Sequence, residues 1–214
     1  MQAEAGATLY LIRHAESAGN VAAATAPLVI PPAALGTPLT LLGARQARAL
    51  ARALRPVPAA AVISSDLLRA RQTAERLAAG RGLAVRVELA LRERERAALR
   101  GWSDAELRQL AAAYARLSPT EQEAWRRAHP PEEPEAVLAR VIPALRAIAA
   151  AHRDETALVV SHGGAMRLLL AHLGYAPAAS LAIENTGYIQ LLGDGEAFAV
   201  GATVGVHLRD PGPG

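Results

Sequence analysis

The sequence predicts an α/β fold, a three-layer α/β/α sandwich with a mostly parallel central sheet. Short apolar runs, typical of buried strands, alternate along the chain with longer segments of helical character. Strands that are separated by helices run parallel, and the helices cover both faces of the sheet. The 214 residues contain no internal repeat. We therefore expect one domain over residues 1–214.

The first part of the chain supplies three of the expected strands and two of the helices. The strands are predicted over residues 8–12, 60–63 and 83–89. Thr40 is a plausible N-cap for a helix over 40–54, because its hydroxyl can accept from the first-turn N–H groups. A second helix is predicted over 66–79, since Gly80 and Gly82 follow it.

The second part predicts a helical insertion over 101–134 and a return to strands. Ser103 with Glu106, and Ser118 with Glu121, have the spacing of capping boxes. The later elements are predicted as a helix over 135–152, a strand over 157–160, a helix opening at Gly163, and a hairpin of 189–192 with 197–204. The insertion and the proline-rich, aperiodic segment 21–37 are expected to lie over the strand ends.

The composition excludes several classes of protein. The chain has no cysteine, which excludes disulfides, zinc-thiolate sites and thiol catalysis. All 23 basic residues are arginine, so Schiff-base chemistry is excluded too. Aromatic residues are only 3%, too few to stack nucleic-acid bases. With no apolar run of about 18 residues and no signal peptide, we expect a cytoplasmic protein without a membrane or nucleic-acid partner.

Polar motifs follow three of the predicted buried strands. Arg13-His14 ends the first, Ser161-His162-Gly163 ends another, and a segment carrying Arg69 follows a third. Ligands of open α/β sheets bind at the carboxyl ends of the strands. Two guanidinium groups and two imidazoles at this edge suit a phosphate dianion. No carboxylate and histidine set at ligand spacing indicates a metal site, and no cofactor is expected.

These motifs make the sequence similar to the histidine phosphatase superfamily, also called the phosphoglycerate mutase-like family. Residues 13–17 match its Arg-His-Gly-Glu-Ser motif with alanine in place of glycine, and residues 161–164 match its second histidine motif. Residues 39–47 and 65–74 match two further signatures, in the family's order. The resemblance implies a phosphomonoesterase, a metal-independent histidine acid-type phosphatase acting on a small phosphorylated substrate, with the insertion lying over the active site.

The resemblance also implies the roles of individual residues. His14 would be the nucleophile that takes up the phosphoryl group. Arg13, Arg69 and His162 would hold the non-bridging phosphate oxygens. Neutral hydrogen bonds to the phosphate are expected from Ser17, Asn20 and the Gly163 N–H.

A general acid is expected after the third strand, where Leu91-Arg92-Glu93 matches the family. Glu93 is our choice, because Gly101 lies at the expected distance from it. Glu95 is the alternative, because the alternating charges of residues 92–96 allow the alignment to the family to shift by two residues. The family's glycine shortly after the acid is Ala97 in this chain.

Two alternative functions share the same motifs. A phosphoglycerate mutase would need extra donors around its substrate, but Gly164 lacks one and Asp104 stands where a cation is needed. Arg96 and the Arg126–Arg127 pair are the cations that would favour a mutase. A non-catalytic phospho-ligand binding module is the other alternative, although both histidines and the acid are present. The sequence leaves open the physiological substrate and whether the chain forms a homodimer.

Overall fold

The computed structural model describes residues 6–25, 37–95, 99 and 103–209. The strands are β1 (Ala7–Arg13), β2 (Ala59–Ser64), β3 (Val85–Val87), β4 (Thr156–Ser161), β5 (Leu181–Gly193) and β6 (Phe198–Leu208). The helices are α1 (Ala18–Thr25), α2 (Leu41–Ala53), α3 (Leu68–Ala79), α4 (Asp104–Tyr114), α5 (Pro119–Ala128), α6 (Pro134–Ala151) and α7 (Gly163–His172), with short 3-10 turns η1 (Leu89–Leu91) and η3 (Ala178–Ser180).

These strands form one sheet in the order β3-β2-β4-β1-β5-β6. The first four pair in parallel, whereas β5 runs antiparallel to β1 and β6 antiparallel to β5. The mostly parallel sheet predicted from the sequence is therefore confirmed. Its topology places the carboxyl ends of β1, β2 and β4 side by side at one edge of the sheet.

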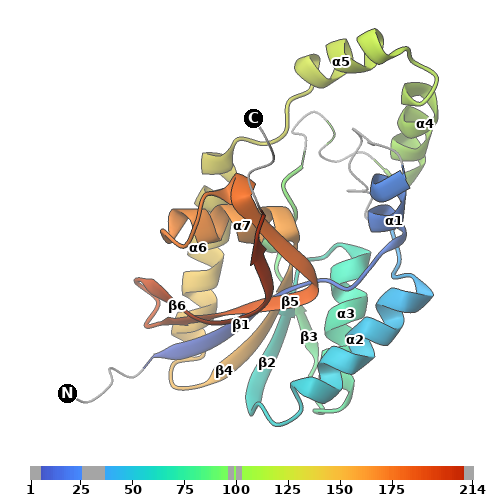
Figure 1. Cartoon of the computed structure of the whole chain (residues 1–214). Helices are drawn as coiled ribbons and strands as arrows, with labels where there is room; N and C mark the ends of the chain where they lie inside the picture. Colours follow the sequence, from blue (N-terminus) through green and yellow to red (C-terminus); the bar gives the residue numbers. More distant parts are fainter. Residues whose placement is uncertain (1–5, 26–36, 96–98, 100–102, 210–214) are drawn as a thin grey trace.

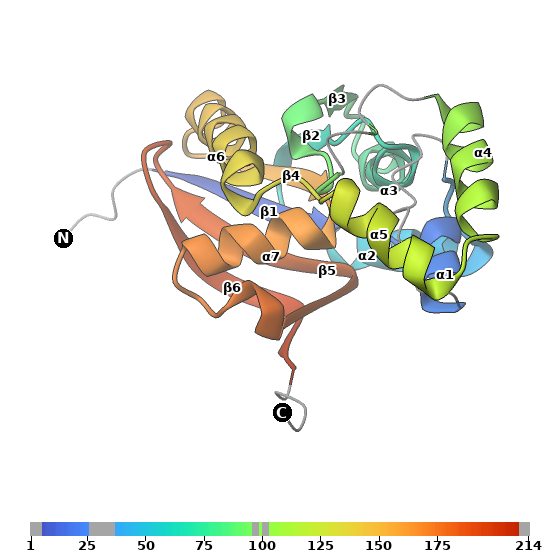
Figure 2. The same ribbon diagram turned by 90° about the horizontal axis from the view of Figure 1, so that it is seen from above.

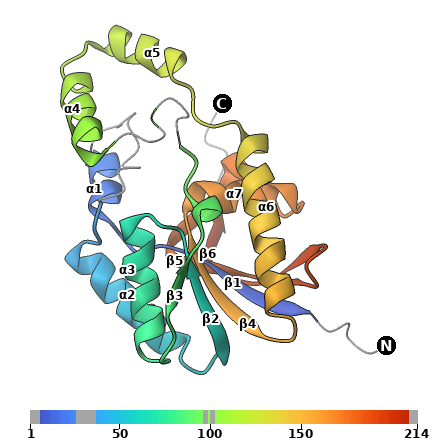
Figure 3. The same ribbon diagram turned by 180° about the vertical axis from the view of Figure 1, so that it is seen from behind.

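Helices cover both faces of the sheet, as predicted (Figure 1). Figure 3 shows α2 and α3 on one face and α6 and α7 on the other. Strand β4 explains how both faces are filled, because successive side chains point to opposite sides. Ala157 and Val159 belong to the core beneath α6 and α7, whereas Leu158 and Val160 belong to the core beneath α2 and α3.

The helix signals identified in the sequence act as predicted. The Thr40 hydroxyl accepts from the Gly43 N–H at 2.9 Å, and Ser118 with Glu121 makes a complete capping box. Helix α6 continues through Pro143, which lacks the N–H that would bond to the Ala139 carbonyl. Both residues are exposed, so water can take the place of the missing bond.

Three predicted elements differ from the structure by two or more residues at an end. Helix α3 begins at Leu68 rather than at residue 66, because Asp66 is bound to Arg92 instead of capping the helix. The predicted strand 83–89 is only β3, followed by η1. The predicted hairpin is real but much longer, since β5 continues across an irregular stretch with Thr186 at a φ of +65°.

Helices α4 and α5 lie within the predicted insertion and extend away from the sheet. Figure 2 shows them beside α1, at the end of the molecule opposite the N-terminus. Tyr114 packs against Leu110, Leu117 and Trp125 in a small cluster separate from the two main cores. Helix α1 covers part of the segment expected to be aperiodic, so that prediction is wrong for residues 21–25; residues 26–36 lie outside the described part.

No helix within the described residues is long and apolar enough to cross a lipid bilayer.

Candidate active site

Sheet register brings the three sequence motifs together. Arg13 is paired with Ser161 across β1 and β4, and the His14 N–H donates to the Ser161 carbonyl at 3.0 Å. The next residue on each strand end is therefore a histidine, and the two imidazole centroids lie 5.0 Å apart. Strand β2, on the other side of β4, leads into α3 and brings Arg69 to the same place.

The hydrogen bonds of His14 define its tautomer. Its Nδ1 lies 2.7 Å from the Ala15 carbonyl oxygen, which can only accept, so Nδ1 carries the hydrogen. Its Nε2 accepts from the Arg69 Nε–H at 3.1 Å, which requires a lone pair on Nε2. Both contacts are satisfied by the same neutral form of the ring, which presents Nε2 as its basic atom.

Burial and nearby cations keep both histidines neutral. His14 is 3% exposed, and burial lowers its pKa well below the usual value of 6.5. The positive charge of Arg69 lowers that pKa further, against the opposing effect of the Ala15 hydrogen bond. Burial also lowers the pKa of His162, which has no exposed surface, and Arg69 adds to that effect.

His162 has one partnered and one unpartnered nitrogen. Its Nε2 lies 2.9 Å from the Ser65 hydroxyl, but its buried Nδ1 has no hydrogen-bond partner in the described structure. When the Ser65 O–H donates to Nε2, the neutral ring carries its hydrogen on Nδ1. The histidine then holds one buried N–H donor without an acceptor.

The two arginines differ in how they are held. The Arg13 Nη1 donates to the Ile183 carbonyl, while its buried Nε has no partner in the described structure. Arg69 is buried, and desolvation lowers its pKa to about 10, so it stays charged at neutral pH. Gly163 lies against Arg13: a Cβ on Gly163 would come within 3.2 Å of Arg13 Nε. As the first residue of α7, Gly163 has no intrahelical acceptor for its N–H.

Ser17 and Asn20 form a local network. The Ser17 backbone N–H and hydroxyl both donate to Asn20 Oδ1 at 3.0 Å. The Ser17 hydroxyl is thus engaged with Asn20 rather than aimed at the histidines. Asn185, which sequence reasoning did not identify, donates to the His14 carbonyl at 3.0 Å and to Asn20 Oδ1 at 3.3 Å. With its oxygen held by these donors, Asn20 presents its Nδ2 amide on the other side.

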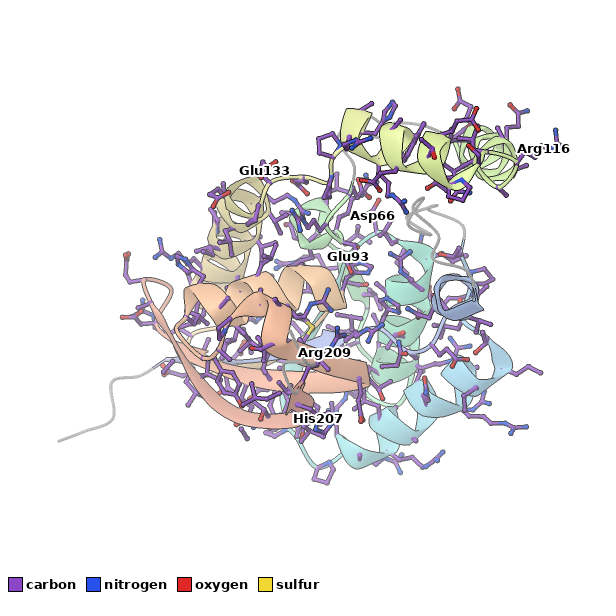
Figure 4. All side chains as sticks on the ribbon, turned by 45° about the horizontal axis from the view of Figure 1, so that its top comes forward. Asp66, Glu93, Arg116, Glu133, His207 and Arg209 are labelled. Carbon is purple, nitrogen blue, oxygen red and sulfur yellow. The ribbon has the colours of Figure 1, made fainter. Side chains whose placement is uncertain are left out.

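The Glu93 carboxylate lies at the N-terminus of α7, the helix that begins directly after His162. Its Oε2 accepts from the Gly164 N–H and its Oε1 from the Ala165 N–H, both at 3.0 Å, and Oε1 also accepts from the Arg94 N–H at 2.8 Å. Figure 4 shows Glu93 between α7 and α3. A helix N-terminus attracts a carboxylate, so this position is favourable for Glu93.

Glu95 occupies a different environment. It is 9% exposed and lies 4.0 Å from Arg92, in a cavity of about 830 Å³ between η1 and the start of α6. Its carbonyl accepts from the Glu132 N–H at 2.6 Å. Glu93 hydrogen-bonds to the helix that begins after His162, whereas the contacts described for Glu95 are with Arg92 and Glu132.

Gly164 makes room for the Glu93 carboxylate. A Cβ at this position would lie 2.3 Å from Glu93 Oε1 and 3.0 Å from its Cδ, so any side chain would push the carboxylate away. Sequence reasoning noted only that Gly164 lacks a donor. Its steric role could not be found without the contact to a residue 71 positions earlier in the chain.

The residues considered for a mutase are not assembled at this site within the described structure. Arg126 is bound to Glu123 on the surface of α5 at 2.7 Å, and Arg127 is exposed beside it. Arg96, Ala97 and Gly101 lie outside the described residues. In the described ranges, no group of three or more histidine, aspartate or glutamate side chains could hold a metal ion.

Comparisons with known proteins agree with the motifs. A family model for the histidine phosphatase superfamily (branch 1) matches residues 9–203. The adenosylcobalamin/alpha-ribazole phosphatase of Salmonella typhimurium is 33% identical over 178 residues, 81% of this chain and 82% of that protein. The glucosyl-3-phosphoglycerate phosphatase of Mycobacterium tuberculosis is 31% identical over 197 residues, 86% of this chain and 85% of that protein.

The fold is also found among solved structures. Bacillus stearothermophilus YhfR is 28% identical, covers 93% of this chain and 96% of its own, and superposes with a TM-score of 0.69. The family match spans all four sequence motifs and both strand-end histidines. The chain belongs to the histidine phosphatase superfamily.

Proposed function

We propose that this protein is a phosphomonoesterase that hydrolyses small phosphate monoesters through a phosphohistidine at His14. One observation carries the proposal: two buried nitrogens that have no hydrogen-bond partner within the described residues, Arg13 Nε and His162 Nδ1, accompany the basic Nε2 of His14. Leaving a buried donor unpaired costs about 1–3 kcal/mol, and the oxygens of a phosphate monoester would satisfy both. Arg69 adds a charged group that matches phosphate geometry.

The reaction takes place in two displacements at phosphorus. When the substrate binds, the Arg69 Nε–H turns from His14 Nε2 to a phosphate oxygen and so frees the Nε2 lone pair. That lone pair attacks phosphorus, a P–N bond forms, and the P–O bond to the leaving alcohol breaks. Arg13, Arg69 and His162 stabilise the charge on the non-bridging oxygens, with Asn20 and the Gly163 N–H adding neutral hydrogen bonds. Because Ser17 holds Asn20 Oδ1, its role is to orient that amide. Water then attacks phosphorus, the P–N bond breaks, and inorganic phosphate leaves.

Glu93 supplies and recovers the proton. In the first displacement its carboxyl O–H protonates the departing alkoxide, and in the second the carboxylate takes a proton from the attacking water. Its Oε2 accepts one backbone hydrogen bond, whereas Oε1 accepts two. We therefore assign the transferred proton to Oε2, which has a lone pair that accepts no hydrogen bond from the backbone.

The chemistry is proposed to need no metal ion. Divalent metals in other phosphatases neutralise phosphate charge and orient the nucleophile. Here two guanidinium groups supply the charge and the Ala15 carbonyl orients the nucleophilic imidazole. The expected enzyme is thus a metal-independent histidine phosphatase of the acid type.

The names of the relatives indicate two different phosphate esters, alpha-ribazole phosphate and glucosyl-3-phosphoglycerate. The proposed substrate class is therefore small organic phosphate monoesters. A mutase is not favoured, because both curated relatives are phosphatases and Gly164 offers no side-chain donor. We therefore expect hydrolysis to exceed isomerisation.

A metal-free screen tests the proposal. Inorganic phosphate release is measured from aryl phosphates, sugar phosphates, nucleotides, alpha-ribazole phosphate and phosphoglycerates, each with and without chelator. We expect release from at least one monoester at undiminished rate in chelator. Activity that returns only with a divalent ion would contradict the metal-free mechanism. With a bisphosphoglycerate primer, faster formation of 2-phosphoglycerate than of phosphate would contradict the phosphatase.

A further inference from the structure

Arg140 on α6 uses all five of its guanidinium N–H groups within the described structure. Nη1 donates to the carbonyls of Ala90 at 2.7 Å and Arg92 at 2.8 Å, and Nη2 donates to the carbonyl of Glu93 at 3.0 Å. Nε and Nη2 also bind the Glu132 carboxylate at 3.1 and 2.9 Å. No motif in the sequence singled this arginine out.

The three carbonyls belong to the segment that carries Glu93. After η1, residues 92–95 have no regular secondary structure, so no ladder of sheet or helix bonds fixes their backbone. Arg140 supplies the missing donors from a helix that packs on the sheet. The backbone position of Glu93 thus depends on a side chain that is 47 residues away in sequence.

Glu132 holds Arg140 in place. Glu132 is buried, with 7% of the residue exposed, and both of its carboxylate oxygens accept from the guanidinium in a bidentate ion pair. The main chain of Glu132 is joined to the same loop: its N–H donates to the Glu95 carbonyl and its carbonyl accepts from Arg94 Nε, both at 2.6 Å. Residues 92–95 are therefore hydrogen-bonded to Arg140 of α6 and to Glu132, which precedes that helix, and the Glu93 carboxylate is hydrogen-bonded to α7.

We propose that Arg140, held by Glu132, is a positioning residue that sets the backbone of Glu93 so that its carboxyl group reaches the leaving-group oxygen. The inference rests on the proposed function, since it assigns Arg140 an effect on proton transfer. Arg140 acts through Glu93 and does not touch the substrate. Small displacements of a reacting group have large effects on rate, about 100-fold for 1 Å in unfavourable cases.

The test substitutes Arg140→Lys, which keeps the charge but removes the planar fork of five donors. Keeping the charge matters because Arg140 is one of the cations that lower the pKa of buried His162. The measured quantity is kcat/KM, which reports the steps up to departure of the leaving group. Substrates are p-nitrophenyl phosphate, whose leaving group needs no proton, and an alkyl phosphate, whose leaving group does.

We expect Arg140→Lys to lower kcat/KM by about tenfold or more for the alkyl ester and by less than about threefold for the aryl ester. Arg146→Lys, an exposed substitution on the same helix, is the matched control and should change neither value. An equal loss on both esters would overturn the inference, because a general loss of structure does not distinguish leaving groups.

A double-mutant cycle with Glu93→Gln separates positioning from an independent effect. If Arg140 acts through Glu93, Arg140→Lys should have little further effect on alkyl-ester hydrolysis once the acid is removed. Additive losses in the double variant would contradict the proposal, even if each single variant showed the expected leaving-group dependence.

Glu132→Gln provides the test if Arg140→Lys does not fold. This variant retains Arg140 and its hydrogen bonds to three carbonyls, but it weakens the ion pair between residue 132 and Arg140. We therefore expect a smaller loss of kcat/KM, which again is greater for the alkyl ester than for the aryl ester. An unchanged ratio of the two kcat/KM values in a folded Glu132→Gln would overturn the inference. Failure of the proposed function is distinguishable, because the wild type would then hydrolyse neither ester.

Discussion

The two histidines and the acid Glu93 face the same site but are held in contrasting ways. His14 and His162 follow adjacent parallel strands, and the register of β1 with β4 alone brings them side by side. Glu93 lies in a loop outside the sheet, and the Arg140 side chain of α6 together with the first turn of α7 holds it in place. The ends of paired strands hold the two histidines, whereas the position of Glu93, the proposed proton donor, depends on a few long-range contacts. Substitutions in the two regions should therefore have different effects on the hydrolysis of aryl and alkyl esters.

The largest expected effect is at the strand ends. His14→Asn removes the basic Nε2 and should reduce hydrolysis of aryl and alkyl esters alike to the uncatalysed level. Phosphate release and acid-labile, alkali-stable phosphorylation of the protein are the measurements. His129→Asn, in the insertion, is the matched control and should retain activity. Substantial turnover by His14→Asn would exclude the phosphohistidine mechanism.

A loss that depends on the leaving group is expected from Glu93→Gln. Removal of a general acid costs about 10²–10⁴-fold, and only where the leaving group needs a proton. Alkyl-ester hydrolysis should therefore fall by this factor, with aryl esters much less affected. Glu95→Gln is compared in the same assay. A stronger effect at Glu95 would transfer the role to that residue.

Gly164→Ala should reduce the contribution of Glu93 to alkyl-ester hydrolysis without removing the residue. The new Cβ would collide with Glu93 Oε1, and because that oxygen ends a flexible side chain, the carboxylate moves while the fold survives. We expect a drop of about 10–100-fold in kcat/KM for alkyl esters and little change in melting temperature. Gly80→Ala, where a Cβ meets nothing within 4 Å, is the control. Wild-type alkyl-ester activity in Gly164→Ala would show that Glu93 need not sit at α7.

The smallest expected effect is on stability against pH. Burial lowers the pKa of His14 and His162 well below 6.5 in the folded protein, so below pH 6.5 the unfolded chain binds more protons than the folded one. Stability should therefore decrease as the pH falls from 6.5 towards the folded-state pKa values, by up to about 1.4 kcal/mol per pH unit for each histidine.

His162→Asn removes one of these titrating groups and should reduce the slope of unfolding free energy against pH between pH 6.5 and 5. Urea unfolding at several pH values measures it, with the exposed His172→Gln as control for the loss of an imidazole. A slope unchanged in His162→Asn would mean that this histidine is not held neutral by the fold.

Local patterns in the sequence were sufficient to predict the layers of the fold and to bring the residues of the candidate site to one edge of the sheet. Apolar runs gave the parallel strands, and capping residues such as Thr40 and Ser118 gave the helix starts, because these signals act over a few residues. The predicted start of α3 was wrong where a distant contact intervenes, because Asp66 binds Arg92 instead of capping the helix. Strand-end motifs placed His14, His162 and Arg69 together, since parallel register follows from the α/β pattern.

What only the tertiary structure decided is how each group is oriented. The tautomer of His14 follows from its contacts with Ala15 and Arg69, and the hydrogen bonds of Glu93 to α7 are the reason for proposing Glu93 over Glu95 as the acid. Glu93 requires glycine at position 164, 71 residues later in the chain, and its carbonyl accepts a hydrogen bond from Arg140, 47 residues later. A single sequence carries no signal for such pairs, because hydrogen-bond geometry and steric room depend on how separate elements pack.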